Sequence, residues 1–590
     1  MTPRRLAVVA AAVLGAFMGV VGWPAWQDAI EPAQVLAGLV VYPADAPVGQ
    51  YSTRTWTLLH QLPAAALWLG LSDATVNAAI NAVLGALAYA GLALVIALGR
   101  PSPVVIALAP MLILQSGLTR FHPGYPVGLF GLPYTYGVAA QMLGTVVLAL
   151  AAHGATRTSL FLLGLFPAVH IAFGSLLWCV AGLTWLSTRR LTGPTPWRWF
   201  FYGAALTVAS FAIHHVLWVP RVPVLPPLWP DLTTSPEALA RLTEGARTFW
   251  DDHRQPLVWT NPSVIVALVA PPLLLTAWRF VALPPATRRW PIALTMAIVV
   301  GFAGLALAHT SPSSPFGALI PNRIWNISLF TLMATTLALG LRPEADPWIR
   351  AWASVLIVAL ALLHFPTWPG LPDLRSASVD IVTSFGMPMG PFVAAIGAAG
   401  IAATLMVTLV IQRTATGTRL GPAAARVTSR AMFALLVLFC TITTGLTIRE
   451  APLAAQSLTP PPALEVARNR EGLLLTAGNM HTIQAWTRRA IVIDGGALDF
   501  LAYVPSAAPV TERALQELYG VSLTRPLDDW GPAGSLPPEV DRATWEARLP
   551  SDWRALAKTW RFTDIVTPHD WRLQLPRLSV DRDLAVWDAR

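Results

Sequence analysis

The chain has 590 residues, of which 55% are hydrophobic and only 12% are charged. Soluble domains carry about 25% charged residues, so this composition excludes an ordinary soluble enzyme and predicts a polytopic α-helical membrane protein. The formal net charge of +9 does not indicate nucleic-acid binding, because the arginines follow the ends of apolar segments, where membrane topology places them. The two cysteines lie within apolar segments and offer neither a disulfide framework nor a thiolate metal site.

Apolar segments of bilayer-spanning length predict about thirteen transmembrane helices within residues 1–449. These helices are expected at residues 6–22, 74–98, 103–119, 137–154, 159–172, 173–188, 199–218, 262–281, 291–309, 324–341, 350–366, 391–412 and 431–448. Arginines stand before the first segment, at Arg4 and Arg5, and further arginine clusters follow every second segment after that. This spacing predicts a cytoplasmic N-terminus and an outer C-terminus in a bacterial inner membrane.

The first outer loop contains a carboxylate, Asp45, followed by a half-helix whose start is too polar to cross a bilayer comfortably. That half-helix carries Arg54 and His60. Because a carboxylate at a membrane surface is costly, the arrangement favours a functional site. Most of the eleven histidines, His170 among them, also map to outer ends of spans. The alternative is that histidine simply tolerates the interface.

Residues 120–137 form a second outer loop that is rich in aromatic and turn residues, including His122, Tyr134 and Tyr136. Its rings and hydroxyls are suited to stacking on a sugar and bonding to it, although an aromatic belt at the membrane surface has the same composition. Further along, Arg323 and Asn326 stand at the mouth of a span. An arginine there can bind the phosphate of a lipid, or it can be an ordinary arginine that reaches the headgroups.

The segment Asp251, Asp252 and His253 follows a predicted amphipathic helix at 237–250. Adjacent carboxylates beside a histidine can hold a divalent cation, but a solvated turn has the same residues. Elsewhere there is no phosphate-binding loop, dinucleotide fingerprint, zinc spacing or nucleophile elbow. The spans carry few interior charges, which disfavours an ion-coupled transporter.

Residues 450–590 differ in composition and predict a small extracytoplasmic α/β domain. Alternating residues predict strands at 490–494, 563–567 and 584–587, with helices at 511–519 and 542–560 between them.

The order of these features resembles the C-type glycosyltransferases, which are multi-spanning enzymes that use polyprenyl-phosphate sugars, and in particular a bacterial branch of that superfamily. The resemblance is carried by Asp45, Tyr51, HQLP at 60–63, LGLS at 69–72, the span that ends at Arg100, the motifs at 125–137 and 163–170, and those at 487–494 and 562–568.

The resemblance implies transfer of a sugar from a polyprenyl-phosphate donor to an acceptor on the outer face of the membrane, in envelope or surface-polysaccharide assembly. Asp45 would be the general base, and Arg323, with Arg54, would hold the donor phosphate. The other candidates position donor and acceptor or line the sugar pocket: His60, His122, Tyr134, Tyr136, His170 and Asn326.

These roles require the candidate residues to surround one outward-facing pocket. No redox cofactor is implied, and a requirement for Mg²⁺ or Mn²⁺ stays open. The expected partners are membrane lipid and envelope-assembly proteins. Two alternatives remain: a non-catalytic scaffold or polysaccharide-export component with the same fold, and a glycolipid transporter with polar groups near the membrane midplane.

Overall fold

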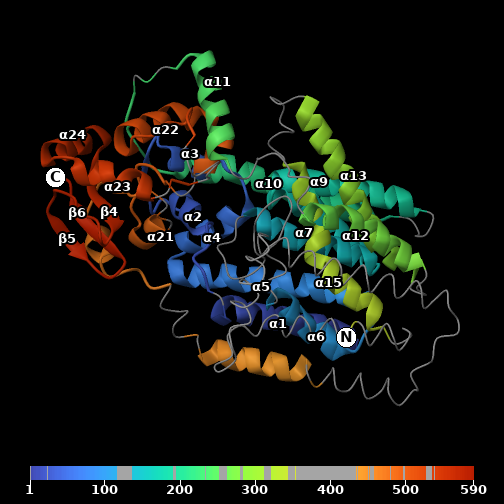
Figure 1. Ribbon diagram of the computed structural model, residues 1–590. Coiled ribbons are helices and arrows are strands. Elements are labelled where there is room, and N and C mark those ends of the chain that lie inside the picture. The colour runs from blue at the N-terminus through green and yellow to red at the C-terminus, as the bar shows by residue number, and fades with distance from the viewer. Residues whose placement is uncertain are drawn as a thin grey trace. The chain divides into compact units, whose positions relative to one another are not determined.

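The structure is a computed structural model (Figure 1). It describes residues 2–115, 136–189, 195–251, 262–279, 284–310, 320–342, 353, 434–451 and 458–590, apart from positions 23, 231, 233, 435, 450, 479, 481, 496–497, 527–534 and 537. The predicted spans at 350–366 and 391–412 lie outside the described residues.

The chain divides into two compact units. Unit 1 comprises Met1–Ala25, Ala78–Thr207 and Leu257–Ala455, and unit 2 comprises Trp26–Asn77, Val208–Pro256 and Gln456–Arg590. The predicted domain boundary at 449/450 stays a prediction. The C-terminal residues share their compact unit with two earlier segments, which the sequence did not indicate.

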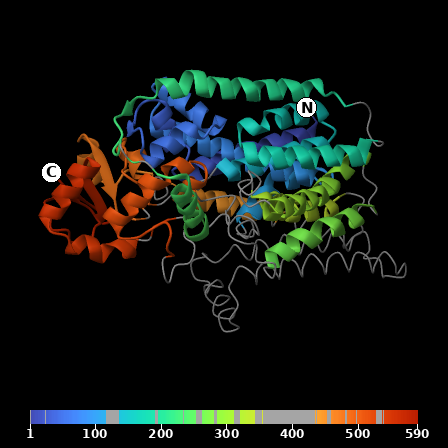
Figure 2. The ribbon, with the colours of Figure 1, turned by 90° about the horizontal axis from the view of Figure 1, so that it is seen from above.

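Unit 1 is built from apolar helices. Its helical elements are α1 (Pro3–Phe17), η1 (Met18–Gly22), most of α5 (Asp73–Ala97), α6 (Pro103–Gln115), α7 (Tyr136–Ala152), α8 (Thr156–Leu165), η3 (Phe166–Ala168), α9 (Ile171–Thr188), the first part of α10 (Arg198–Ile213), α12 (Pro262–Arg279), η8 (Pro285–Arg288), α13 (Arg289–Thr310), η9 (Pro321–Trp325) and α15 (Asn326–Gly340). Helices α12 and α13 pack side by side (Figures 1 and 2).

Five helices in the described part of the chain are long and apolar enough to cross a membrane: Pro3–Gly22, Asp73–Ala97, Ile171–Thr188, Arg198–Arg221 and Pro285–Leu307. Shorter apolar helices lie at Pro103–Leu114, Gly137–Ala152 and Leu436–Arg449. Each coincides with a predicted span. The protein is therefore a polytopic helical membrane protein, while the number thirteen stays a prediction.

Helices α1 and α5 contact each other at glycines, which allow their backbones to approach closely. A Cβ on Gly15 would overlap the backbone carbonyl of Gly85, and a Cβ on Gly85 would overlap that of Gly15. Small residues allow such close backbone approach where lipid provides no hydrophobic drive for association. Gly19 makes the same kind of approach to the carbonyl of Asn81.

We expect Gly85→Val to destabilise unit 1 by about 1–3 kcal/mol, because the added side chain forces the two backbones apart. The thermal unfolding midpoint of the full chain in lipid nanodiscs measures the effect. Gly182→Val in α9 is the matched control, since a Cβ there meets nothing within 4 Å. Equal midpoints for the two variants would contradict the crossing.

Unit 2 combines short helices with a small sheet. Its first segment contains α2 (Ile30–Leu36), β1 (Tyr42–Pro43), α3 (Pro47–Arg54) and α4 (Leu58–Trp68), and its second contains η5 (His214–Trp218), η6 (Val219–Arg221), β2 (Val224–Leu225), α11 (Pro236–Gly245) and η7 (Ala246–Trp250). Strands β1 and β2 pair in parallel. The amphipathic helix predicted at 237–250 is present as α11 and η7.

The C-terminal segment of unit 2 forms an α/β arrangement. Its elements are α20 (Leu464–Arg468), β3 (Leu473–Thr476), α21 (Ile483–Thr487), η10 (Leu498–Ala502), η11 (Pro505–Ala507), α22 (Ala508–Ala514), η12 (Leu515–Tyr519), α23 (Pro538–Ala547), α24 (Pro550–Trp560), β4 (Phe562–Pro568), β5 (Arg577–Val580) and β6 (Leu584–Asp588). Its strands form a sheet in the order β3-β4-β6-β5, in which β3 and β4 are parallel and the other pairs antiparallel.

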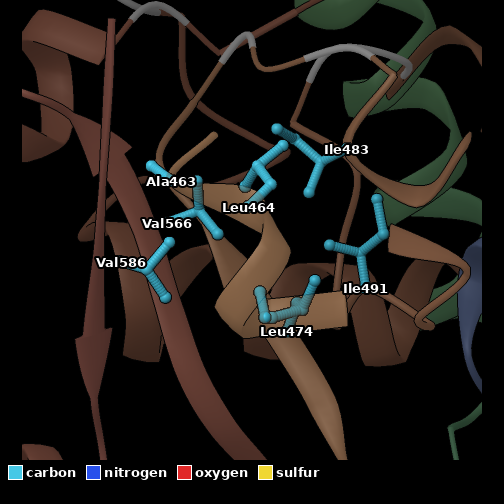
Figure 3. Close-up of a cluster of buried hydrophobic side chains, with 8 residues drawn as sticks. Ala463, Leu464, Leu474, Ile483, Ile491, Val566 and Val586 are labelled. Carbon is cyan, nitrogen blue, oxygen red and sulfur yellow. The ribbon is translucent and has the colours of Figure 1, made fainter. Parts of the chain in front are cut away.

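An apolar cluster lies against this sheet (Figure 3). Its members come from α20, α21, the strands and the segment beside β3: Ala463, Leu464, Ala467, Leu474, Ile483, Ile491, Val566 and Val586. Burial of such side chains is the main stabilising contribution in a small fold.

Three details differ from the predicted α/β pattern. The strand expected at 490–494 is reduced to a single bridge between Ile491 and Leu474. The helix expected at 542–560 is two helices, because Pro550 begins α24 and cannot continue α23. Strands β3 and β5 were not predicted, since their short sequences lack a clear alternation.

Candidate functional site

Helices α7, α9 and α15 of unit 1 meet at Gly144 in α7. A Cβ at this position would lie 3.2 Å from Phe173 Cε1 in α9 and 3.4 Å from Ile327 Cδ1 in α15. The short helix η9 precedes α15 directly and packs against α9 and α13. A Cβ on Gly301 or Gly304 of α13 would overlap Trp325 or Pro321 of η9, so these glycines allow η9 to sit close.

Helices α7 and α15 run in the same direction. Gly144 lies against Ile327, and nearer the other ends Arg289 Nη1 donates to Ala151 O at 3.1 Å while Trp290 Nε1 donates to Thr335 Oγ1 at 3.0 Å. Residues one turn apart share a helix face. Gln141, one turn before Gly144, therefore lies toward the start of α15 and η9.

Five polar side chains of α7, η9, α15 and the cap of α9 are buried, and we call them the polar cluster. Their exposed fractions are 0% for Gln141, 5% for His170, 6% for Arg323, 0% for Asn326 and 2% for Ser328. The sequence predicted three of them as site residues, His170, Arg323 and Asn326. The charge of Arg323 acts on His170, and Asn326 follows Arg323 by three residues where η9 continues into α15.

The members of the polar cluster differ in how they are bonded. His170 caps α9 by accepting a hydrogen bond from Phe173 N at 3.3 Å on its Nδ1, and the charge of Arg323 lies close enough to act on its ring. In contrast, the amides of Gln141 and Asn326 and the hydroxyl of Ser328 have no hydrogen-bond partner among the described residues. Unpaired polar groups inside an apolar bundle are costly, so this is a site that a polar ligand would stabilise.

The backbone just before η9 is strained. Ile320 has φ 45° and ψ 69°, in the left-handed region. A β-branched residue is rarely found there, and such strain gathers at functional sites, where the surrounding structure maintains it.

In unit 2, Asp45 holds a proline-rich strap, which we define as residues 222–230. Its Oδ1 accepts from Leu228 N and its Oδ2 from Trp229 N, both at 2.7 Å. Arg561 donates to the carbonyls of Pro226 and Pro227 in the same strap, at 3.0 Å each. The carboxylate predicted as a general base thus also fixes the backbone of a segment far along the chain.

The strap ends in an aromatic stack. The Arg513 guanidinium carbon lies 3.4 Å from the centroid of the Trp229 ring, a cation–π contact. The Trp560 ring meets the same indole edge to face, with centroids 5.3 Å apart. Trp229 is therefore held twice: its backbone N–H donates to Asp45, and its ring packs against Arg513 and Trp560 of the C-terminal segment of unit 2.

The other predicted residues of this unit have local partners. Arg54 at the end of α3 donates from Nη1 to Ser506 Oγ at 2.5 Å. His60 in α4 is buried, and this burial lowers the pKa of its imidazole to about 3, with His214 adding to the effect. His60 is therefore neutral at physiological pH and can position a group only through hydrogen bonds.

A second carboxylate of the first loop, Glu31 in α2, was not predicted. Burial, reinforced by the nearby charges of Asp494 and Asp28, raises the pKa of Glu31 to about 8. Its Oε1 accepts a hydrogen bond from Ala485 N at 3.3 Å. A carboxyl that releases its proton near neutral pH is suited to proton transfer. The feature of the sequence that could have indicated Glu31 is an acidic residue shortly after the first predicted span.

A chain of amide and hydroxyl groups surrounds Glu31. Gln484 donates from Nε2 to Glu31 O at 2.9 Å, and Tyr42 OH donates to Gln484 Oε1 at 2.6 Å. Gln34 donates to Asp73 Oδ1 at 3.1 Å, and Asp73 forms an ion pair with Arg488 at 2.7 Å. These bonds join α2, β1 and the start of α5 to α21, which fixes the position of the Glu31 carboxyl.

The remaining candidates cannot be placed at a site. His122, Tyr134, Asp252 and His253 lie outside the described residues, and Tyr136 is described only as the first residue of α7. Asp251 is buried at the end of η7. Within the described ranges no group of three or more His, Cys, Asp or Glu side chains is arranged to hold a metal ion.

These observations define a helical membrane protein with a buried, cationic polar cluster in one unit and a carboxyl of raised pKa in the other. No protein-family model matches the chain, and no curated protein matches it.

Among solved structures, the chain is similar to ArnT from Cupriavidus metallidurans, both bound to undecaprenyl phosphate and in the apo state. For each the sequence identity is 15% and the TM-score 0.43, over 99% of this chain and 98% of ArnT. Arabinofuranosyltransferase AftD from Mycobacteria gives 16% identity and a TM-score of 0.32, over 98% of this chain and 37% of AftD. Both neighbours are C-type glycosyltransferases, the superfamily that the sequence resembles.

Proposed function

We propose that this protein is a glycosyltransferase of a bacterial inner membrane, which moves a sugar from a polyprenyl-phosphate donor to an acceptor on the outer face during envelope or surface-polysaccharide assembly. The observation that carries the proposal is Arg323. Its guanidinium side chain is buried inside a bundle of apolar helices, next to the unpartnered amide of Asn326. A buried cation in a membrane domain marks an anionic ligand or a transport pathway.

Arg323 would bind the donor phosphate, because a guanidinium offers several donors in a planar fork that matches phosphate oxygens. His170 and Asn326 would position the donor, and Arg54 and His60 remain proposed substrate-binding residues. Transfer then needs a base to remove the proton of the acceptor hydroxyl while the bond between sugar and phosphate breaks. This step requires no redox cofactor, and treatment with EDTA tests the need for Mg²⁺ or Mn²⁺.

Two carboxyls are candidates for the base. The resemblance points to Asp45, whose oxygens each accept a backbone N–H. We favour Glu31, because its pKa of about 8 lies near the working pH, where a general base is most effective. Asp45 would then act by holding the strap.

A transfer assay with the full chain in nanodiscs tests the function, using synthetic polyprenyl-phosphate sugars and release of polyprenyl phosphate as the readout. We expect Arg323→Met to lower kcat/KM by roughly 10- to 150-fold, the equivalent of one or more lost hydrogen bonds to a charged group. Arg323→Lys should retain part of the activity.

The matched control is Arg157→Met, which removes an exposed arginine from α8 of the same unit and should leave kcat/KM unchanged. Equal activity of Arg323→Met and wild type would remove Arg323 from the mechanism. No transfer from any donor by protein that still binds polyprenyl phosphate would favour the scaffold or export alternative.

A further inference from the structure

The charges of unit 1 are one-sided. Among the residues that the structure describes, this unit contains no aspartate and no glutamate. Arginines stand at the ends of its helices, and four of them follow α5, begin α8 or lie where η8 continues into α13: Arg100, Arg157, Arg288 and Arg289. Positive charges without opposite charges nearby repel one another, so this part of the unit attracts an anion.

Several helix ends gather where these arginines lie. The His153 side chain, just after α7, places Nε2 2.7 Å from the carbonyl oxygen of Leu94 in the last turn of α5. A Cβ on Gly99 would overlap the carbonyl of Ala338, near the end of α15. Since Arg323 precedes the start of α15, these contacts lie toward the end of the unit that is away from Arg323.

Arg289 is the buried cation of this end. It is the first residue of α13 and only 8% exposed. Its Nη1 donates to Ala151 O at 3.1 Å and to Thr156 Oγ1 at 3.5 Å. Neither Nε nor Nη2 has a hydrogen-bond partner among the described residues.

The bonds of Arg289 leave most of its charge unbalanced. Ala151 is in the last turn of α7, where the helix end offers only a partial negative charge. A guanidinium has five N–H donors, and a buried charge is costly unless an opposite charge accompanies it. The free donors of Arg289 are therefore suited to an anionic ligand.

The surface beside Arg289 is apolar. Helix α13 belongs to a segment that is long and apolar enough to cross a membrane. Four residues after the exposed Arg288, an accessible stripe begins with the half-buried Ile292 and continues through Met296 to Val299, which is 49% exposed. Residues three or four apart share one helix face. A ligand with an anionic head and apolar tails matches both the arginines and this stripe, whereas an acidic protein matches only the arginines.

We propose that the end of unit 1 formed by α7, α8 and α13 binds the phosphate headgroup of an anionic membrane phospholipid, with Arg289 as its anchor and Arg288 as a second contact. Arginine forks match phosphate oxygens, and basic pockets between transmembrane helices bind anionic headgroups. The lipid supplies the negative charge that the described part of this unit lacks. The inference goes beyond the proposed function, because it uses neither Arg323 nor the carboxyls of unit 2.

Native mass spectrometry of the full chain tests the site by titration with phosphatidylglycerol and with phosphatidylcholine of the same acyl chains. We expect wild type to bind the anionic lipid about 10-fold or more tightly. Arg289→Gln should lose most of this preference, since hydrogen bonds to a charged group are the strong ones, and Arg289→Lys should keep part of it. Arg288→Gln, which changes an exposed side chain and so leaves the fold intact, should lower the preference about fivefold.

The matched control is Arg157→Gln, which removes an exposed arginine at the start of α8, next to Thr156. Its effect should stay within about twofold, because solvent and salt screen an exposed charge that does not contact the lipid. If Arg157→Gln lowers the preference as far as Arg289→Gln does, net charge alone attracts the lipid and the inference is wrong.

Stability separates lipid binding from a purely structural role of Arg289. A ligand that binds only the folded state raises the unfolding temperature, so wild type should unfold at a higher temperature in phosphatidylglycerol nanodiscs than in phosphatidylcholine nanodiscs. Arg289→Gln should remove this difference. If Arg289 does no more than cap α7, the substitution lowers both temperatures equally and the difference remains.

Two further results would overturn the inference. One is equal binding of the two lipids by wild type, which would leave an acidic protein as the partner of this end. The other is an unchanged preference in both Arg288→Gln and Arg289→Gln. Neither result bears on sugar transfer, which is measured separately with the Arg323 variants.

Discussion

Replacing Arg489 with methionine is expected to destabilise unit 2 by about 3–5 kcal/mol, the cost of leaving one partner of a buried ion pair without the other. Arg489 pairs with Asp564 of β4 at 2.5 Å, and the two side chains are 5% and 0% exposed. Burial lowers the pKa of this arginine, but the hydrogen bond that it donates to Asp564 opposes that effect.

Arg489 also satisfies several backbone carbonyls around the sheet. Its guanidinium donates to the oxygens of Ala467, Glu471, Gly472 and Leu473 at 3.0–3.2 Å. Methionine fills a similar volume but donates nothing, so these carbonyls and Asp564 lose their partner together. Chemical denaturation followed by tryptophan fluorescence measures the loss, since Trp545, Trp553 and Trp560 are fully buried in this unit.

Arg582→Met is the control for the loss of an arginine, because its pair with Asp583 is exposed and exposed pairs contribute little. The double variant Arg489→Met with Asp564→Leu should recover part of the stability, since it removes the unpaired charge as well. A single variant as stable as wild type would show that Arg489 does not hold the sheet.

Glu31→Gln is expected to reduce sugar transfer by about 10²–10⁴-fold, the usual contribution of a general base, whereas Asp45→Asn should reduce it less. Glutamine keeps the size of the side chain and its acceptor oxygen but cannot take a proton. Loss of the Asp45 carboxylate instead loosens the strap at Leu228 and Trp229, which should appear mainly as lower stability. The opposite ranking of the two variants would return the role of base to Asp45.

The pH dependence gives an independent check on Glu31. Its pKa rises from 4.5 to about 8 on folding, so between these values the folded state binds a proton that the unfolded chain has released. Stability therefore falls as the pH rises through this window. Activity rises over the same range, because the base must be deprotonated. Glu31→Gln should flatten the fall in stability, and an unchanged slope would show that another group titrates.

The membrane-spanning segments were predictable because a bilayer imposes a simple requirement. A crossing needs about 20 mostly apolar residues whose backbone groups bond within the helix, and this can be seen in any stretch such as 74–98. The α/β elements of residues 458–590 were harder, because short strands owe their existence to pairing. Strand β3 exists beside β4, about 90 residues later, and its own sequence gives little indication of this.

Part of the candidate site was also visible in the sequence. Arg323, Asn326 and His170 stood out as polar residues at the ends of apolar spans, and the structure shows all three buried within unit 1. Gln141 and Ser328 were missed, since one amide or hydroxyl within a span is usually satisfied by the helix itself. Whether a polar atom has a partner depends on which helices face it, and the sequence does not contain that information.

The sequence by itself determined that this chain lies in a membrane, which stretches form its apolar helices, and which polar residues stand near their ends, because these follow from local composition and the thickness of a bilayer. Only the tertiary structure decided which acid is primed to accept a proton and which amides are left unpaired. Glu31 owes its raised pKa to burial and to the charge of Asp494, more than 450 residues away, and burial and charge act through space rather than along the chain.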